Sequence, residues 1–234
     1  MANTTRTSSC APSSVRVYIW EAGARNFVEE VSHDKLDQYS RAFFVYFSFR
    51  PALDGHKREI TLPERFANQD ALRIVLRAIK QYKPARDTHL IRLVNAIDTS
   101  TRCLIWHAAR KLYIQPPTAE LSLRNSIAYR ISHEKVTPDS MTKIYEVFRP
   151  HHPELTPYRT MVHQYVYYLI RNMYDSREEV EELARIVDLL PGLREDVDEK
   201  LQVEQPKYNQ YLHHQRINQK RREEGAAKRR EQQK

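Results

Sequence analysis

Apolar and polar residues alternate along residues 15–20, which follow a polar leader. This two-residue period is typical of a β-strand with one buried face. Residues 21–25 contain the only glycine of the region and predict a turn, so residues 27–31 are expected to return as a second strand. The segment REITLPE, residues 58–64, predicts a third short strand that Pro63 ends. The pattern therefore predicts a small sheet in the first quarter of the chain.

The densest apolar stretch is NFVEEVSHDKLDQYSRAFFVYFSF, residues 26–49. Ser32 is expected to cap a helix here, with Asp34 in its positively polarised first turn. The apolar side of that helix would consist of Leu36, Tyr39, Phe43 and Phe44. Large apolar side chains are normally buried, so this side is expected to be core. The same four residues are the candidate protein interface if part of the side faces a partner.

From Asn68 onward, apolar residues recur at three- and four-residue spacing, which predicts a series of one-sided helices. Asn68 and Thr137 are expected N-caps, and Ser176 with Glu179 has the spacing of a capping box. The apolar sides are expected within residues 72–79, 90–97, 105–112, 123–131, 141–148, 158–169 and 180–190. Residues 193–234 have a weakening apolar stripe and rising charge, which fits either an extended helix or a frayed tail.

Composition agrees with a helix-rich globular protein. The chain has 234 residues, 41% of them apolar, with only four glycines and fourteen tyrosines, which argues against an all-β or disordered chain. The expected fold class is α+β and mainly helical, with a small N-terminal β-sheet flanked by helices and a C-terminal helical extension. No run of about 18 apolar residues exists, so no membrane partner is expected. Cys10 and Cys103 lie far apart and predict no disulfide framework, which suits a reducing setting in the nucleus or cytoplasm.

The net charge of +8 is unevenly distributed. Residues 177–204 hold about ten acidic and four basic residues, whereas residues 207–234 hold about nine basic and three acidic ones. Three interpretations of this basic tail are open: a solvated terminus, a contact for nucleic acid or a nuclear import signal. The candidate nucleic-acid contacts are Lys220, Arg221, Arg222, Lys228, Arg229 and Arg230.

No catalytic, cofactor or metal site is expected from the sequence. Ser32, His33 and Asp34 contain the three residue types of a catalytic triad, but neighbours on one helix point in different directions. With four scattered glycines, no glycine-rich loop can bring backbone amides to a phosphate. The His pairs 151–152 and 213–214 are adjacent, whereas two metal ligands on one helical face need i, i+4 spacing.

The order of the expected elements resembles the BTB/POZ family, and in particular fungal BTB-like proteins. The resemblance covers roughly residues 15–169, and at Ser32 the chain departs from the family's usual histidine. Residues 84–102 also fit the family pattern poorly. The matching features are the spacing Leu36, Ser40, Phe43 (L-x3-S-x2-F), the segment REITLPE, a helix ending at Tyr82, the segment AARKLYI (108–114) and a Tyr/Phe-rich extension (136–166).

The resemblance implies a non-catalytic protein-interaction module that forms a homodimer or recruits another protein. Together with composition and charge, it predicts a division into a disordered leader (1–14), a BTB/POZ-like domain (15–135), a helical extension (136–204) and a charged basic tail (205–234). Some members are substrate adaptors of cullin-type ubiquitin ligases and carry a hydrophobic-x-Glu element after the first helix. Residues 45–57 contain no such element, which lowers the expectation of a cullin partner.

Overall fold

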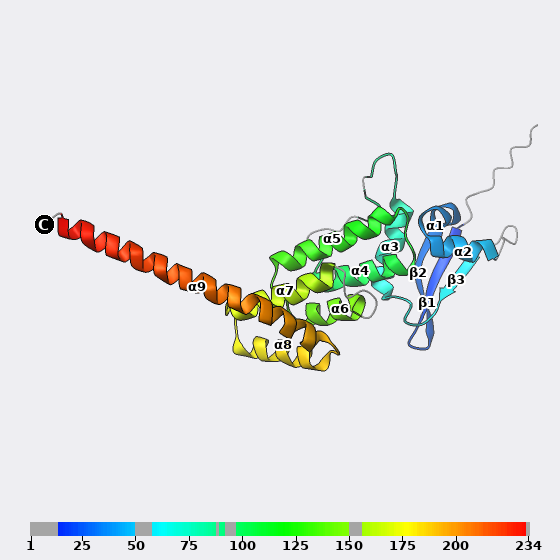
Figure 1. The fold of residues 1–234 in the computed structure, drawn as a ribbon. Helices are drawn as coiled ribbons and strands as arrows, with labels where there is room; N and C mark the ends of the chain where they lie inside the picture. The colour runs from blue at the N-terminus through cyan, green and yellow to red at the C-terminus, as the bar shows by residue number, and fades with distance from the viewer. Residues whose placement is uncertain (1–13, 50–57, 88, 92–96, 150–155, 233–234) are drawn as a thin grey trace, which may run out of the picture. The chain divides into compact units, whose positions relative to one another are not determined.

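The computed structural model describes most of the chain, and its ribbon is drawn in Figure 1. The chain divides into an N-terminal unit, Met1–Arg130, and a C-terminal unit, Ile131–Lys234. The residues that the structure describes are 14–49, 58–87, 89–91, 97–149 and 156–232, with the side chains of residues 225 and 227–232 left out. In this part of the chain the fold is mainly helical, with a small mixed sheet near the N-terminus, as predicted.

The sheet consists of β1 (Ser14–Glu21), β2 (Ala24–Ser32) and β3 (Arg58–Leu62), in the order β2-β1-β3. β1 pairs antiparallel with β2 and parallel with β3. The hairpin turn is made by Ala22 and Gly23, whose positive φ angles of 51° and 75° suit the twist of a two-residue turn. Val15, Val17 and Ile19 of β1 are buried, so the strand prediction and its inward face are confirmed.

Two short helices, α1 (His33–Tyr39) and α2 (Arg41–Phe49), replace the single helix that was predicted. Ser32 caps α1 as expected, since its hydroxyl accepts a hydrogen bond from the Lys35 amide at 3.4 Å. The helix stops at Ser40, which has an extended backbone and forms an isolated antiparallel bridge with Ile114. The Ser40 hydroxyl donates to the Leu112 carbonyl at 2.7 Å, so a contact distant in sequence divides the helix.

The rest of the N-terminal unit is helical, with α3 (Gln69–Gln81), α4 (Thr99–Lys111) and α5 (Pro117–His133). Asn68 caps α3 as predicted, because its side chain accepts from the Ala71 amide at 3.0 Å. α3 packs against β2 and α4. The completely buried side chains of these helices are Leu72, Val75, Leu76, Ile79, Cys103, Ile105, Ala108, Ala109 and Ile127.

The prediction of a helix within residues 90–97 is wrong at residues 90, 91 and 97. Residues 92–96 lie outside the described part of the chain. Leu90 and Ile91 are buried but not helical. Ile97 also lies outside any helix, and its carbonyl accepts hydrogen bonds from Arg102 and Arg130 at 2.9 and 2.8 Å. The next residue, Asp98, has an extended backbone and caps α4, so a helix cannot run through this point.

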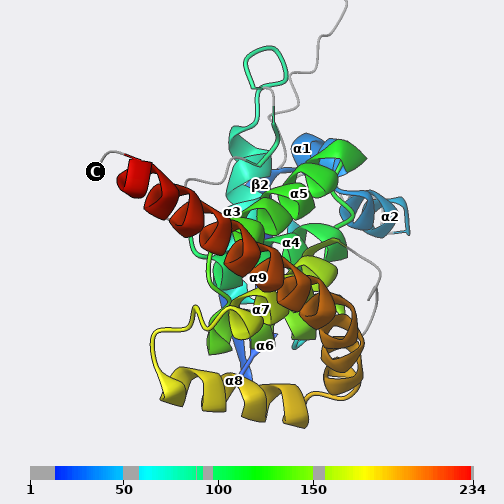
Figure 2. The same ribbon diagram turned by 60° about the vertical axis from the view of Figure 1, so that its left-hand side comes forward.

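The C-terminal unit contains α6 (Pro138–Phe148), α7 (Thr156–Ile170), α8 (Arg177–Leu189) and α9 (Leu193–Gln232). α7 lies beside α6 and the first turns of α9, while α8 packs against α6 and α9 (Figure 2). Gly192, with φ of 76°, makes the sharp turn between α8 and α9. The core of the unit is formed by Met141, Ile144, Phe148, Met161, Val166, Leu183, Val187, Leu193 and Val197.

Local signals set the starts of these helices. Thr137 caps α6 in a capping box whose second member is Ser140. Ser176 accepts from the Glu179 amide at 3.1 Å, as its spacing predicted. The Glu179 carboxylate, however, accepts from the Lys135 ammonium at 3.0 Å. The sequence therefore gave the right cap but not the role of the acidic side chain.

The last helix, α9, continues as one helix past α7 and α8 (Figure 1). Of the two alternatives for residues 193–234, the structure has the extended helix, and the compositional boundary expected at residue 205 falls within it. The helix contains Pro206, which cannot donate a backbone hydrogen bond to the preceding turn.

Candidate interaction surfaces

The outward side of α2 is the largest local departure from the predicted core. Phe44 is 50% exposed, Val45 is 44% exposed and Phe49 is 82% exposed. We call these three residues the α2 face. The other candidate interface residues Leu36, Tyr39 and Phe43 are buried, as the core interpretation predicted. Phe44 was wrongly placed beside them.

The break at Ser40 explains this error. A continuous helix keeps residues 36, 43 and 44 on one side, but the extended backbone at Ser40 changes the direction in which α2 presents its side chains. In α2, Phe43 and Phe47 point inward, and their rings lie 6.1 Å apart. Apolar residues lie on every side of the segment AFFVYFSF, so its sequence does not show which side is buried.

The sheet face opposite the core carries a charged and aromatic ladder. Arg25 donates to Glu59 at 2.8 Å, and its guanidinium carbon lies 3.6 Å from the centroid of the Tyr18 ring. Arg16 pairs with Glu30 at 3.4 Å. The hydrogen bond from Arg25 is the main cause that holds the pKa of Glu59 below its usual value. These ion pairs are partly exposed to solvent, so each contributes little to stability.

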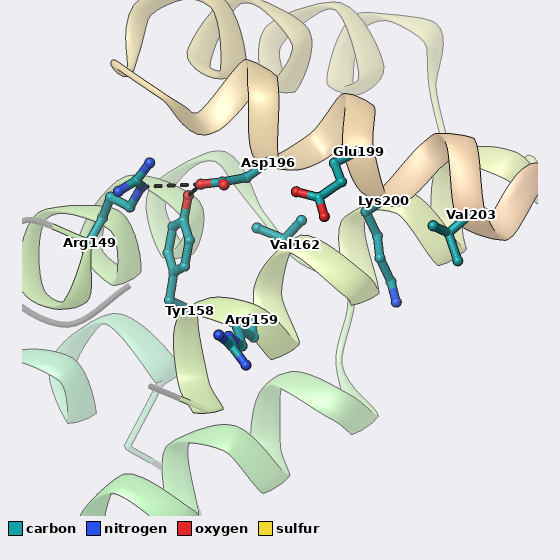
Figure 3. Close-up of a pocket in the computed structure, with 8 residues that line it drawn as sticks. All are labelled: Arg149, Tyr158, Arg159, Val162, Asp196, Glu199, Lys200 and Val203. Atoms are coloured by element: carbon teal, nitrogen blue, oxygen red, sulfur yellow. Dashed lines mark hydrogen bonds and ion pairs between the residues drawn. The ribbon is translucent and has the colours of Figure 1, made fainter. Parts of the chain in front are cut away.

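A cavity of about 630 Å³ lies between α7 and α9 in the C-terminal unit (Figure 3). At one end, the Tyr158 hydroxyl donates to Asp196 at 2.5 Å, and Arg149 pairs with the same carboxylate at 3.1 Å. Burial is the main cause that raises the pKa of Tyr158, and its hydrogen bond to Asp196 acts in the same direction. Tyr158 is therefore a neutral donor at physiological pH.

Side chains at this end of the cavity connect three helices. Asp196 joins the start of α9 to α7 through Tyr158 and to the end of α6 through Arg149. The two apolar residues that line the cavity are Val162 and Val203. The other described residues that line the cavity are Arg159, Glu199 and Lys200.

A second and smaller cavity, of about 150 Å³, lies farther along the same pair of helices. It brings together tyrosines of α7 and α9 with Arg171, which follows α7. Arg171 lies over two rings, 4.1 Å from the centroid of Tyr167 and 5.1 Å from that of Tyr208. We call Tyr167, Arg171, Tyr208 and Tyr211 the tyrosine–arginine cluster. The sequence pattern alone does not connect Tyr167 with α9.

The basic residues of the predicted tail lie on α9. Lys220, Arg221 and Arg222 are exposed, and the Lys220 ammonium lies 4.0 Å from Glu224. The backbone of α9 extends over Lys228, Arg229 and Arg230, whose side chains lie outside the described part of the chain. All six candidate residues thus lie on α9, and the side chains of the first three are described.

Of the triad residue types near the N-terminus, the structure brings His33 and Asp34 together, with 3.7 Å between Nδ1 and Oδ1, while Ser32 has another role. Ser32 caps α1, and the His33 ring packs on Phe47 with centroids 4.2 Å apart. The Nε2 atom of His33 lies 3.0 Å from an Arg58 guanidinium nitrogen. The adjacent pair His213 and His214 lies on α9 with ring centroids 6.2 Å apart.

Two searches of the described residues bear on metals and membranes. No group of three or more His, Cys, Asp or Glu side chains there is arranged to hold a metal ion. The other adjacent histidine pair, His151 and His152, lies outside the described residues. Within the same described part, the helices lack the combination of length and apolar character that crossing a membrane requires.

Comparisons of the chain with protein-family models, with curated proteins and with solved structures found no significant match.

Proposed function

We propose that this chain is a protein-interaction module of BTB/POZ type that self-associates through the α2 face. The element order in the N-terminal unit supports the proposal: two strands, a helical segment, a third strand and the helix that ends before Tyr82. Leu36 and Phe43 of the motif L-x3-S-x2-F are buried, and Ser40 ties the segment to Leu112.

The exposed apolar surface of α2 is the observation that carries the proposal. Three large apolar side chains on one nine-residue helix are unusual on a monomeric surface and typical of a contact site. Arg41 is the only charged residue of α2, so this surface has little to offer a charged partner. A second copy supplies the same apolar side chains and can bury them in an isologous contact.

The test measures the mass of the full-length protein by light scattering after size exclusion. We expect a dimer for the natural sequence and a monomer for the variant that combines Phe44→Glu with Phe49→Glu, since the buried charges would repel and remain unpaired. Leu189→Glu in α8 is the matched control, because Leu189 is 78% exposed but lies in the other unit. This control should remain dimeric.

A natural chain that is monomeric at every concentration tested would contradict self-association. A second outcome that counts against the proposal is a dimer that stays intact in the variant with Phe44→Glu and Phe49→Glu while circular dichroism shows an unchanged fold. In that case the exposed apolar side of α2 would not be the contact between copies.

A further inference from the structure

We propose that the tyrosine–arginine cluster and the adjoining side of α9 bind single-stranded nucleic acid. This inference goes beyond the proposed interaction module, because it concerns the C-terminal unit and another class of partner. It also goes beyond a basic tail, since it depends on aromatic rings and on the position of one guanidinium between them.

The contacts of Arg171 with two tyrosine rings leave it able to bind an anion. Its guanidinium lies over the rings of Tyr167 and Tyr208 at 4.1 and 5.1 Å from their centroids. These distances are those of cation–π contacts. Within the described part of the chain, the Arg171 side chain is exposed and has no ion pair or hydrogen bond. Its N–H donors are therefore available for a phosphate.

The same cluster offers a surface for stacking. The rings of Tyr208 and Tyr211 lie 6.3 Å apart and are within 19° of parallel. Tyr211 is 52% exposed, and its hydroxyl accepts from the Gln215 amide nitrogen at 2.9 Å, which helps to fix the ring. Exposed aromatic rings beside cations are the typical means by which proteins bind unpaired bases.

Glu204, the acidic residue that lines the cavity, repels a phosphate only weakly. Glu204 pairs with Lys200 at 3.0 Å and with Lys207 at 3.2 Å. The hydrogen bond from Lys200 is the first cause that keeps the pKa of Glu204 below its ordinary value. Its charge is therefore matched by two ammonium groups, and Arg171 remains as an additional positive charge at the cavity.

The helical period extends this surface along α9. At 100° per residue, Tyr208 and Tyr211 share one side with Gln215, Asn218 and Arg222. All of these except the half-buried Tyr208 are exposed. From Tyr211 to Arg222 the side is about 17 Å long, at about 1.5 Å per residue. It thus combines aromatic, amide and basic groups in one row.

The distribution of charge favours nucleic acid over a lipid surface. Arg216 and Lys220 lie roughly opposite Tyr211 around the helix. Cations therefore surround the exposed part of α9, whereas a helix that lies on a membrane needs a continuous apolar side. A flexible strand can contact both the row and the flanking cations, which a flat bilayer cannot do.

The test is fluorescence anisotropy with the full chain and labelled probes of about 20 nucleotides: oligo-U RNA, oligo-dT DNA and a DNA duplex. We expect both single strands to bind more tightly than the duplex at about 50 mM salt, and weakening at about 200 mM. Tyr211→Leu keeps the apolar bulk but removes the ring, and should weaken single-strand binding at least about fivefold. Tyr211→Trp should restore it.

Two variants that each remove one positive charge distinguish a phosphate contact of Arg171 from general electrostatic attraction. Arg171→Ala should reduce the slope of log affinity against log salt by about 0.7, the value for one phosphate of a single strand. Arg177→Ala removes one positive charge from α8, outside the cluster, and should leave the affinity within about twofold. Circular dichroism of each variant establishes that the fold is retained.

Several results would overturn the inference. One is the absence of binding to both single strands at about 50 mM salt. Another is an equal or higher affinity for the duplex, and a third is unchanged single-strand affinity in Tyr211→Leu. A preference between oligo-U and oligo-dT supports the inference in either direction and identifies the sugar of the bound strand.

Discussion

At the scale of single residues, the neighbours Phe43 and Phe44 show how strongly burial determines the contribution of a side chain to stability. Phe43 is 2% exposed and packs beside Phe47, while Phe44 is 50% exposed. We expect Phe43→Ala to lower the free energy of unfolding by about 3–5 kcal/mol, and Phe44→Ala to lower it by less than about 1 kcal/mol. Urea unfolding of the two variants measures the difference.

The two variants serve as controls for each other, because each removes the same ring from the same helix. Equal losses would contradict the burial of Phe43 and the exposure of Phe44. If Phe44→Ala also shifts the association equilibrium while leaving the fold intact, the result supports the role of the α2 face in contact between copies.

Glu29 of β2 predicts a pH dependence in the N-terminal unit. Its carboxylate accepts from Arg77 at 2.7 Å and from Lys80 at 2.9 Å, which ties β2 to α3. Burial alone would raise its pKa, but the hydrogen bonds from Arg77 and Lys80 outweigh burial, so the pKa of Glu29 lies below its ordinary value. A carboxylate whose pKa is lowered by folding stabilises the fold at pH values above its unfolded-state pKa. This stabilisation is lost as the pH falls through the folded-state pKa.

We therefore expect Glu29→Gln to lower the free energy of unfolding by about 1–2 kcal/mol at pH 7. The difference from the natural chain should shrink as the pH falls below the pKa of an unfolded glutamate, about 4.3, and toward the lower pKa of Glu29 in the fold. Urea unfolding from pH 7 down to pH 3 measures it. Glu64→Gln, at an exposed position after β3, should show almost no effect at either pH. A constant Glu29→Gln effect across this range would contradict the ion-pair explanation.

At the scale of elements, Pro206 is the clearest local conflict with the structure. It lies inside α9, where it cannot donate to the Gln202 carbonyl and where proline is unfavourable by about 3 kcal/mol relative to alanine. We expect Pro206→Ala to stabilise α9 around this turn. Amide hydrogen exchange of residues 207–212 should become slower, while Gln210→Ala at an exposed position should change it little. Unchanged or faster exchange in Pro206→Ala would contradict a continuous helix.

Elements with local signals were predictable from the sequence, and those fixed by distant contacts were not. The alternation in β1 and the caps at Ser32, Asn68 and Ser176 depend on neighbours within a few residues, and all four were placed correctly. The division of the first helix depends on Ser40 bonding to Leu112, 72 residues away, which no local period records.

The same reasoning applies to the two proposed surfaces. The apolar character of α2 was visible in the sequence, but its exposed side depended on the break at Ser40. The basic residues of α9 were also visible, whereas the contact between Arg171 and Tyr208 exists only because α7 and α9 pack together. Composition therefore pointed to the kinds of partner, and packing selected the residues.

At the scale of the whole molecule, the proposals place self-association in one unit and nucleic-acid binding in the other. A dimer would then present two strand-binding surfaces, and a strand long enough to reach both would bind with a high effective concentration at the second surface. We expect the natural chain to bind an oligo-U of about 40 nucleotides at least tenfold more tightly than one of about 8.

The monomeric variant with Phe44→Glu and Phe49→Glu should keep its affinity for the short probe, because the α2 face takes no part in strand binding. It should lose most of the preference for the long probe, since only one surface remains per particle. Anisotropy titrations with both probes measure this, and Leu189→Glu should behave like the natural chain. An undiminished preference in the monomeric variant would mean that a single chain binds along the whole strand, and that association between copies does not contribute to the affinity.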